Sequence, residues 1–100
     1  MLSNFRSYQL ALELYREVKG TRGLPSHLRD QILRASSSIC LNLSEGSAKP
    51  TPKDRARFYH IALGSCREVQ TVIQLEQEIL VHLHSKADRL AAHLYRLCKS

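Results

Sequence analysis

Glycine and proline are concentrated in two short segments of this chain, and this spacing limits the folds that the chain can adopt. All but one of its four glycines and three prolines lie within residues 20–25 and 46–52. Because these residues end helices and mark turns, the chain divides into long stretches without interior breaks. Only 6% of the residues are aromatic, and β-branched residues are also too few for a sheet. The sequence therefore predicts an all-α protein.

The first predicted helix follows Ser3 and Asn4, which are residue types that cap helix starts, and runs to about Lys19. Gly20 is expected to end it in a left-handed conformation. Its apolar residues recur every three or four positions, at Phe5, Tyr8, Leu12, Tyr15 and Val18. This stripe is expected to face the core.

The second helix is predicted to run from about His27 to Glu45, with Ser26 as its N-cap and Gly46 as its stop. One stripe of this helix is formed by Leu28, Ile32, Ala35, Ile39 and Gly46 with Leu43 beside them, and a second line of small or apolar residues adjoins it. Such a wide arc indicates a helix that packs against neighbours on more than one side.

The third helix is predicted to begin with Thr51 as N-cap and Pro52 in the first turn. Its core face is assigned to Phe58, Ile61, Ala62, Ser65, Val69, Val72 and Ile73. Helical spacing places Glu76 within this apolar arc, so packing is expected to end there. The link to a fourth helix is assigned to residues 82–85, and the fourth helix continues through Leu90, Leu94 and Leu97.

Four helices with short links predict an antiparallel up-down-up-down bundle, with residues 1–100 as a single domain. No apolar run reaches the length that a membrane span needs, and the N-terminus lacks the pattern of a signal peptide. The three cysteines Cys40, Cys66 and Cys98 are odd in number and widely spaced. A disulfide framework is therefore not expected, and the reducing cytoplasm is the predicted location.

Catalytic and metal-binding patterns are missing from the sequence. His82 and His84 are two residues apart, so they point to opposite sides of a helix and cannot share a metal. Serines such as those at 36–38 usually bond to their own helix backbone, and no glycine-rich phosphate loop occurs. We therefore expect no enzyme activity, no metal and no cofactor.

Polar and small residues interrupt the helical pattern where it favours apolar ones. Asn42 borders the apolar stripe of the second helix, where it could bond to a neighbouring helix end or fix helix register. We predict that Asn42 forms a hydrogen bond across helices and that Glu45 lies near a basic group. Gly64 stands mid-helix and is expected to let another backbone approach closely. Glu68 is expected either to pair with an arginine on another helix or to be solvated.

Leu41 falls on the outward arc of the second helix, and Leu63 lies away from the apolar face of the third. Together with Gly64 they favour a contact between subunits, although single exposed leucines are common.

The chain has a formal charge of +6 and a pI of about 9.6. An excess of this size favours a polyanionic partner, RNA or DNA, bound through its phosphates. The predicted contact residues are those that fall off the apolar stripes: Arg16, Arg22, Arg34 and Arg89. Phe5, Phe58 and most tyrosines are assigned to the core, so no stacking platform for bases is expected. The alternative is a protein partner, with the charge incidental.

The second helix also carries a family resemblance. Residues 28–35, followed by Ser38-Ile39-Cys40-Leu41-Asn42-Leu43-Ser44-Glu45-Gly46, resemble the hallmark of small four-helix-bundle proteins encoded in intervening sequences of bacterial 23S rRNA genes. The flanking pattern matches in order and spacing, at Tyr15, Leu24-Pro25, Phe58, Ile61-Ala62, Gly64-Ser65 and Glu68. The accessory variability determinant of diversity-generating retroelements is similar to this family.

The resemblance implies a non-enzymatic bundle that assembles as a homopentamer. The retroelement relative binds its reverse transcriptase and nucleic acid through a basic surface, so a reverse transcriptase is a further partner that the resemblance suggests. The rRNA-encoded members have no settled function.

Overall fold

Four long helices make up most of the computed structural model, which describes the backbone of residues 2–99 and the side chains of residues 5–99. They are α1 (Leu2–Gly20), α2 (Ser26–Ser47), α3 (Pro52–Leu75) and α5 (His84–Lys99). The short helix α4 (Gln77–Leu80) and the 3₁₀ turn η1 (Val81–Leu83) connect α3 to α5. Residues 2–99 include no strand. The predicted all-α class and four-helix bundle are confirmed.

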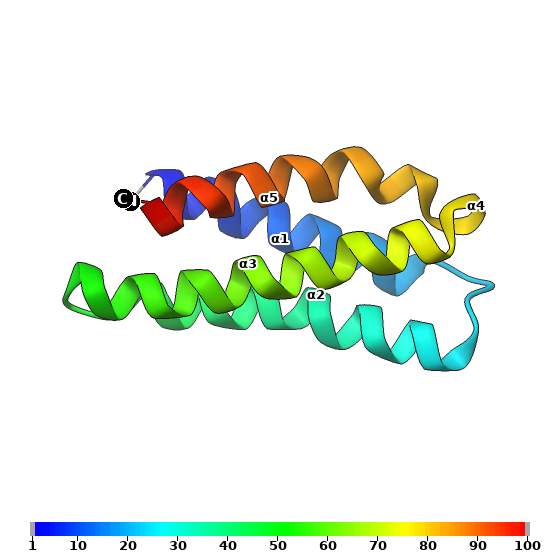
Figure 1. The fold of residues 1–100 in the computed structure, drawn as a ribbon, viewed down its shortest axis with the longest axis horizontal. Helices are drawn as coiled ribbons and strands as arrows, with labels where there is room; N and C mark the ends of the chain where they lie inside the picture. The colour runs from blue at the N-terminus through cyan, green and yellow to red at the C-terminus, as the bar shows by residue number, and fades with distance from the viewer. Residues whose placement is uncertain (1, 100) are drawn as a thin grey trace.

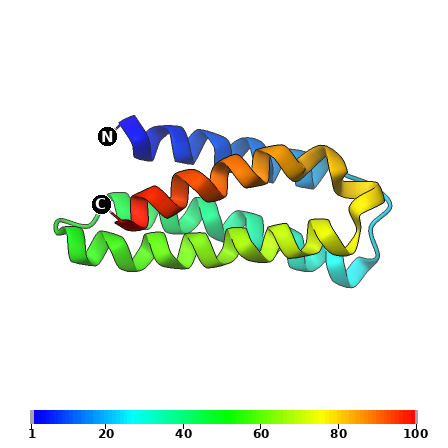
Figure 2. The same ribbon diagram turned by 45° about the horizontal axis from the view of Figure 1, so that its top comes forward.

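The helices lie side by side along a body of 42 × 21 × 18 Å (Figures 1 and 2). Helix α2 packs against α1 and α3, and α5 packs against the same two helices from the other side. The start of α1, the end of α5 and the loop at residues 48–51 lie at one end of the bundle (Figures 1 and 2). We call this the terminus end. The loop at residues 21–25 and the α4–η1 segment lie at the opposite end.

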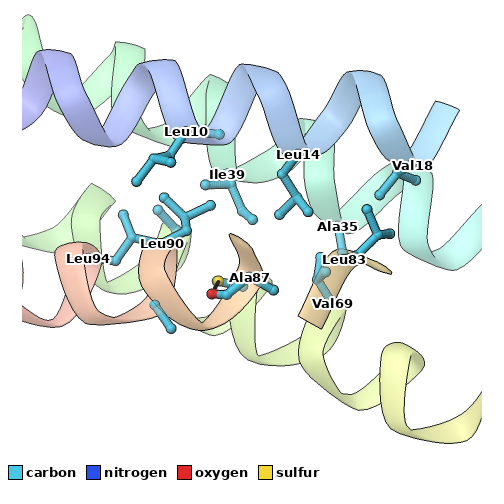
Figure 3. Close-up of a cluster of buried hydrophobic side chains, with 14 of the residues drawn as sticks. Leu10, Leu14, Val18, Ala35, Ile39, Val69, Leu83, Ala87, Leu90 and Leu94 are labelled. Carbon is cyan, nitrogen blue, oxygen red and sulfur yellow. Dashed lines mark hydrogen bonds between the residues drawn. The ribbon is translucent and has the colours of Figure 1, made fainter. Parts of the chain in front are cut away.

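Side chains from all four long helices fill the core, as Figure 3 shows for part of it. The largest fully buried side chains are Leu14, Ile32, Ile39, Leu43, Ile73, Leu80, Leu83, Leu90 and Leu94. The predicted stripe of α2 is confirmed, because Ile32, Ala35 and Ile39 are completely buried.

The predicted core face of α1 is confirmed at Val18, but for the rest of the helix it is wrong by a rotation about the helix axis. Its buried residues are Ser7, Leu10, Ala11, Leu14 and Val18. Tyr8, Leu12 and Tyr15 are only half-buried, and Phe5 is 61% exposed. Small Ser7 and Ala11 face inward and let the neighbouring helices pack closely. Because Ser7 and Ala11 are small, a pattern of large apolar residues alone does not identify this face of α1.

Helix α3 largely follows its prediction. The Asp54 backbone N–H donates to Thr51 Oγ1 over 3.2 Å, which confirms Thr51 as the N-cap. On the core face, however, Tyr59 is buried, and Ile61 is 47% exposed. The side chain of Ile61 instead lies on the outer surface.

The boundaries at the opposite end differ from the sequence prediction. Gly20 belongs to α1 and has no positive φ, whereas Gly23 turns the chain with a φ of 93°. Ser26 is the first residue of α2, and Pro25 precedes it without a side-chain cap. The guanidinium of Arg29 donates to the Lys19 backbone oxygen at the end of α1 over 3.4 Å and to the Thr21 backbone oxygen over 2.8 Å. This bond holds the loop against the start of α2.

The link between α3 and α5 also lies elsewhere than predicted. Helix α3 ends at Leu75, but core packing continues beyond Glu76 instead of ending there as expected, and α5 already begins at His84. The link therefore occupies residues 76–83 rather than 82–85. Leu80 and Leu83 are completely buried, so the side chains of the connection close this end of the core. The connection is itself helical, as α4 and η1.

Gly46 does not stop α2, which continues to Ser47. It is a buried position where α3 comes close to α2. A Cβ atom built on Gly46 would lie 2.8 Å from Cε1 of Tyr59 and 3.0 Å from Cβ of Phe58. Position 46 therefore requires a residue without a side chain because α3 is so close, and not because of an unusual backbone angle.

We predict that Gly46→Ala lowers the free energy of unfolding by about 1–3 kcal/mol, the usual effect of overpacking. Chemical denaturation followed by circular dichroism measures it. Gly20→Ala is the matched control, because a Cβ atom there meets nothing within 4 Å. That variant should be as stable as the parent or more so, since alanine favours helix by up to about 1 kcal/mol. Equal effects of the two substitutions would contradict this role of Gly46.

Candidate nucleic-acid interface

The turn between α2 and α3 gathers positive charge at the terminus end. Lys49, Lys53, Arg55 and Arg57 lie within it or in the first two turns of α3. Asp54 is the acidic residue among them, in the first turn of α3, where a carboxylate stabilises the positive end of a helix. The turn is therefore strongly basic.

An aromatic ring organises two of these cations. The Nζ atom of Lys49 lies 5.2 Å, and the guanidinium carbon of Arg57 5.0 Å, from the centre of the Phe58 ring. Lys49 also pairs with Glu45 over 3.2 Å, and Arg55 donates to the Lys49 backbone oxygen over 3.0 Å. These contacts hold the basic side chains close to the bundle and outward-facing.

The two chain ends add further cations beside this turn. Arg6 lies in the second turn of α1, and Arg96 and Lys99 lie in the last turn of α5. Figures 1 and 2 show both segments at the terminus end. We define the basic end as Arg6, Lys49, Lys53, Arg55, Arg57, Arg96 and Lys99. Among the described side chains, Lys49 is the one member in an ion pair.

Along the rest of the bundle, eight basic residues are nearly balanced by seven acidic ones, and some of these charges form ion pairs. Arg34 donates to Glu68 over 2.7 Å, and Gln31 donates to the same carboxylate over 3.0 Å. On the other side of the bundle, Lys86 of α5 bonds to Glu13 over 3.1 Å and to Glu17. The net positive charge is consequently concentrated at the basic end, where seven basic residues are accompanied by only two acidic ones, Glu45 and Asp54.

The four arginines predicted from the sequence do not form one surface. Arg34 is held by Glu68, and Arg22 lies in the loop at the opposite end. Arg16 is exposed midway along α1, and Arg89 lies near His93 and Arg96 on α5. None of the four belongs to the basic end, although Arg89 shares the neighbour His93 with its member Arg96. The cluster at residues 49–57 was visible in the sequence as four basic residues within nine positions.

Phe5, which was assigned to the core, is exposed instead, and so is one of the tyrosines, Tyr95. Phe5 is 61% and Tyr95 49% exposed, because the buried faces of α1 and α5 lie to one side of them. Lys99 lies 5.2 Å from the centre of the Tyr95 ring. The expectation that no aromatic ring is available for base stacking is wrong.

Asn42 bonds within its own helix, contrary to the prediction. Its amide donates to the Ser38 backbone oxygen (2.9 Å) and to Ser38 Oγ (3.1 Å). Ser38 Oγ in turn lies 2.8 Å from Ser65 Oγ on α3. The amide can reach its own helix because it is four residues, one turn, beyond Ser38. It supports the contact between α2 and α3 through this serine pair.

The other structural residues have mixed outcomes. Glu45 lies near the basic Lys49, as predicted, and Glu68 pairs with an arginine on another helix, which was one of its two predicted alternatives. A Cβ atom on Gly64 would meet nothing within 4 Å, so no backbone of the same chain approaches it. Leu41 is 68% exposed, whereas Leu63 packs partly against the core. Leu63 therefore lies nearer the core than expected.

The described residues contain no group of three histidine, cysteine or acidic side chains that could hold a metal ion. All three cysteines are free thiols. Burial raises the pKa of Cys66 to about 12, and its Sγ donates to the Ala87 backbone oxygen over 3.6 Å. Nothing activates this thiol for chemistry. No helix in the described part of the chain is long and apolar enough to cross a membrane.

Comparison with known proteins gives one finding. The sequence model of the family described as 23S rRNA-intervening sequence protein matches residues 3–100. No curated protein and no solved structure matches the chain.

Lys86 sets how α5 lies against α1, and we predict that Lys86→Met lowers the free energy of unfolding by about 1 kcal/mol at neutral pH. The hydrogen bonds to Glu17 and Glu13 raise the pKa of Lys86 above its ordinary value of 10.5. A raised lysine pKa stabilises the fold below pH 10.5, and that contribution disappears as pH rises further. The difference between variant and parent should therefore shrink in strong alkali, as thermal unfolding would show. Lys53→Met, which removes a lysine with no carboxylate partner, should not destabilise the bundle.

Proposed function

The chain belongs to the family of 23S rRNA-intervening sequence proteins, and from that premise we propose that it is a non-catalytic helical bundle that binds nucleic acid with its basic end. The observation that carries the proposal is the separation of charge. Acidic and basic residues nearly balance along the rest of the bundle, while six cations of the basic end have no carboxylate partner among the described side chains. Phosphates are the ligands that such a surface attracts at long range.

Side chains, and not helix dipoles, supply this positive potential. Two helices begin and two end at the terminus end, so their dipoles largely cancel. Lysine and arginine side chains release counterions when they bind phosphates, which makes affinity depend on salt and little on base sequence.

The exposed rings favour single strands over duplex. Phe5 and Tyr95 are large, exposed and located in the helix ends that carry Arg6 and Lys99. Bases of a single strand stack on such rings, whereas the bases of a duplex are already stacked. We propose RNA or single-stranded DNA as the ligand. An enzyme that handles such strands, for example a reverse transcriptase, would meet the same surface.

The bundle is proposed to have up-down-up-down topology and to assemble as a homopentamer in the cytoplasm. The outer surface of α2 and α3 supports self-association, because Leu41 and Ile61 are both exposed there. Each lies one turn from the Ser38–Ser65 contact, toward the terminus end, so the two side chains form one apolar patch. Gly64, with nothing near it in the chain, leaves room for a neighbouring subunit.

We predict that replacing Lys53 and Arg57 together by glutamate weakens binding to an oligothymidylate by at least about tenfold at low salt. The slope of affinity against salt should fall by about two, one for each lost phosphate contact. Fluorescence anisotropy at several salt concentrations measures both.

The control is the pair Arg16→Glu and Arg22→Glu, which changes the net charge equally but away from the basic end. It should reduce affinity much less. Equal losses would show that net charge alone matters, and no binding by the parent at about 50 mM salt would refute the proposed function and favour an acidic protein partner.

Light scattering at micromolar concentration tests assembly. We expect a mass five times the 11.4 kDa of the chain, and dissociation when Leu41 and Ile61 are both replaced by glutamate. The same replacements at exposed Leu75 and Val81, at the opposite end, should leave the mass unchanged. A monomer mass for the parent would contradict the pentamer.

A further inference from the structure

Three side chains of α5 that carry or can carry positive charge lie on one face of the helix. Arg89, His93 and Arg96 are spaced by four and three residues, so they lie above one another along two turns. Lys86, one turn before Arg89 on the same face, bonds to Glu13 of α1. This bond establishes that the face lies along the contact between the two helices.

Arg6 of α1 comes opposite His93. Helix α1 begins and α5 ends at the terminus end, so the two helices run in opposite directions along their contact (Figures 1 and 2). From the bonded pair of Glu13 and Lys86, seven residues back along α1 lead to Arg6, and seven forward along α5 lead to His93. At about 1.5 Å per residue the two steps cover the same distance.

The half-buried ring of His93 is consequently surrounded by like charge. Its pKa is lowered from the ordinary histidine value, first by burial and then by the positive charges of Arg96, Arg6 and Arg89. The charge that faces it from α1 is Arg6, and those on its own helix are Arg89 and Arg96. None of these four side chains is in an ion pair with a described carboxylate, while Glu13 and Glu17 are bound to Lys86.

We propose that Arg6, Arg89, Arg96 and His93 form a binding site for one phosphate group, and that His93 takes up a proton from solvent when this anion binds. Three guanidinium groups can donate several hydrogen bonds to the oxygens of a tetrahedral anion. The anion offsets their repulsion of a charged imidazole, and the protonated ring then adds a further donor. The inference rests on the proposed function for the source of the phosphate, which is either a strand backbone or the free ion.

The sign of the pH dependence follows from linkage. An anion that favours protonated His93 must bind more tightly as pH falls toward and below about 6.5. Uptake of one proton allows at most about a tenfold gain in affinity per pH unit. Ligands that keep their own charge across this range isolate the contribution of the protein.

The test is an NMR titration of the five histidines with inorganic sulfate as the probe, at constant ionic strength. Sulfate is tetrahedral and does not titrate between about pH 5.5 and 8. Without sulfate, His93 should titrate below about pH 6.5, and saturating sulfate should raise its pKa by about one pH unit. His27, exposed at the opposite end, is the internal control and should not move. A rise at His93 no larger than that at His27 would overturn the proposal.

Two variants separate a built site from general attraction to a basic surface. Arg6→Gln with Arg89→Gln should raise the pKa of His93 in the absence of anion and abolish its response to sulfate. His93→Gln should bind oligothymidylate with no pH dependence between about pH 5.5 and 8, whereas His27→Gln keeps the dependence of the parent. A response to sulfate that survives in the arginine variant would also overturn the site.

The source of the phosphate is distinguished by comparing oligothymidylate with inorganic phosphate. If oligothymidylate raises the pKa of His93 at a far lower phosphate concentration than inorganic phosphate does, the strand backbone is the ligand. If both raise it at the same phosphate concentration, the free ion is the ligand. The two proposals fail separately. If oligothymidylate binds at the basic end and His93 does not respond, only the site is refuted. If sulfate moves His93 and no strand binds, only nucleic-acid binding is refuted.

Discussion

Burial of one face of each helix fixes how that helix is rotated about its axis, and every surface feature of this protein follows from those rotations. Helix α1 turns inward the face that carries Ser7, Ala11 and Leu14. That rotation brings Glu13 and Glu17 to Lys86, and it also leaves Phe5 in solvent. The charged and aromatic surface is therefore a consequence of core packing, and a small error in one rotation relocates several functional residues.

The sequence predicts the fold well because its signals are local. Glycine and proline mark two of the links, Thr51 caps α3, and the wide apolar arc of α2 reflects its packing against both α1 and α3. The α3–α5 link is harder, since residues 76–83 contain neither glycine nor proline and the chain stays helical through it. The face of α1 is ambiguous from sequence, because Tyr8, Leu12 and Tyr15 form a second plausible stripe beside Leu10, Ala11 and Leu14.

The candidate site is less accessible to sequence reasoning, because it depends on which charges are neutralised by other helices. Arg34 resembles any surface arginine until α3 supplies Glu68 across the contact. Arg6 and His93 lie far apart along the chain and meet only when α1 and α5 pack. The prediction for Asn42 fails in the opposite way. Its side chain was expected to form a hydrogen bond to another helix, but its partner, Ser38, lies one turn away on the same helix. In these cases the sequence shows how residues are spaced along one helix, but it does not show which residues of two different helices pair.

Chemical modification of the buried thiol of Cys66 reports how often the folded bundle opens. While α3 and α5 stay packed, its high pKa leaves almost none of the reactive thiolate at neutral pH. Separation of the two helices would expose the sulfur and return it to ordinary reactivity, so alkylating reagents or oxidants would modify this position only in molecules that have opened. The rate of that modification measures how often the bundle opens, and oxidative damage at Cys66 would accumulate in chains that spend time unfolded.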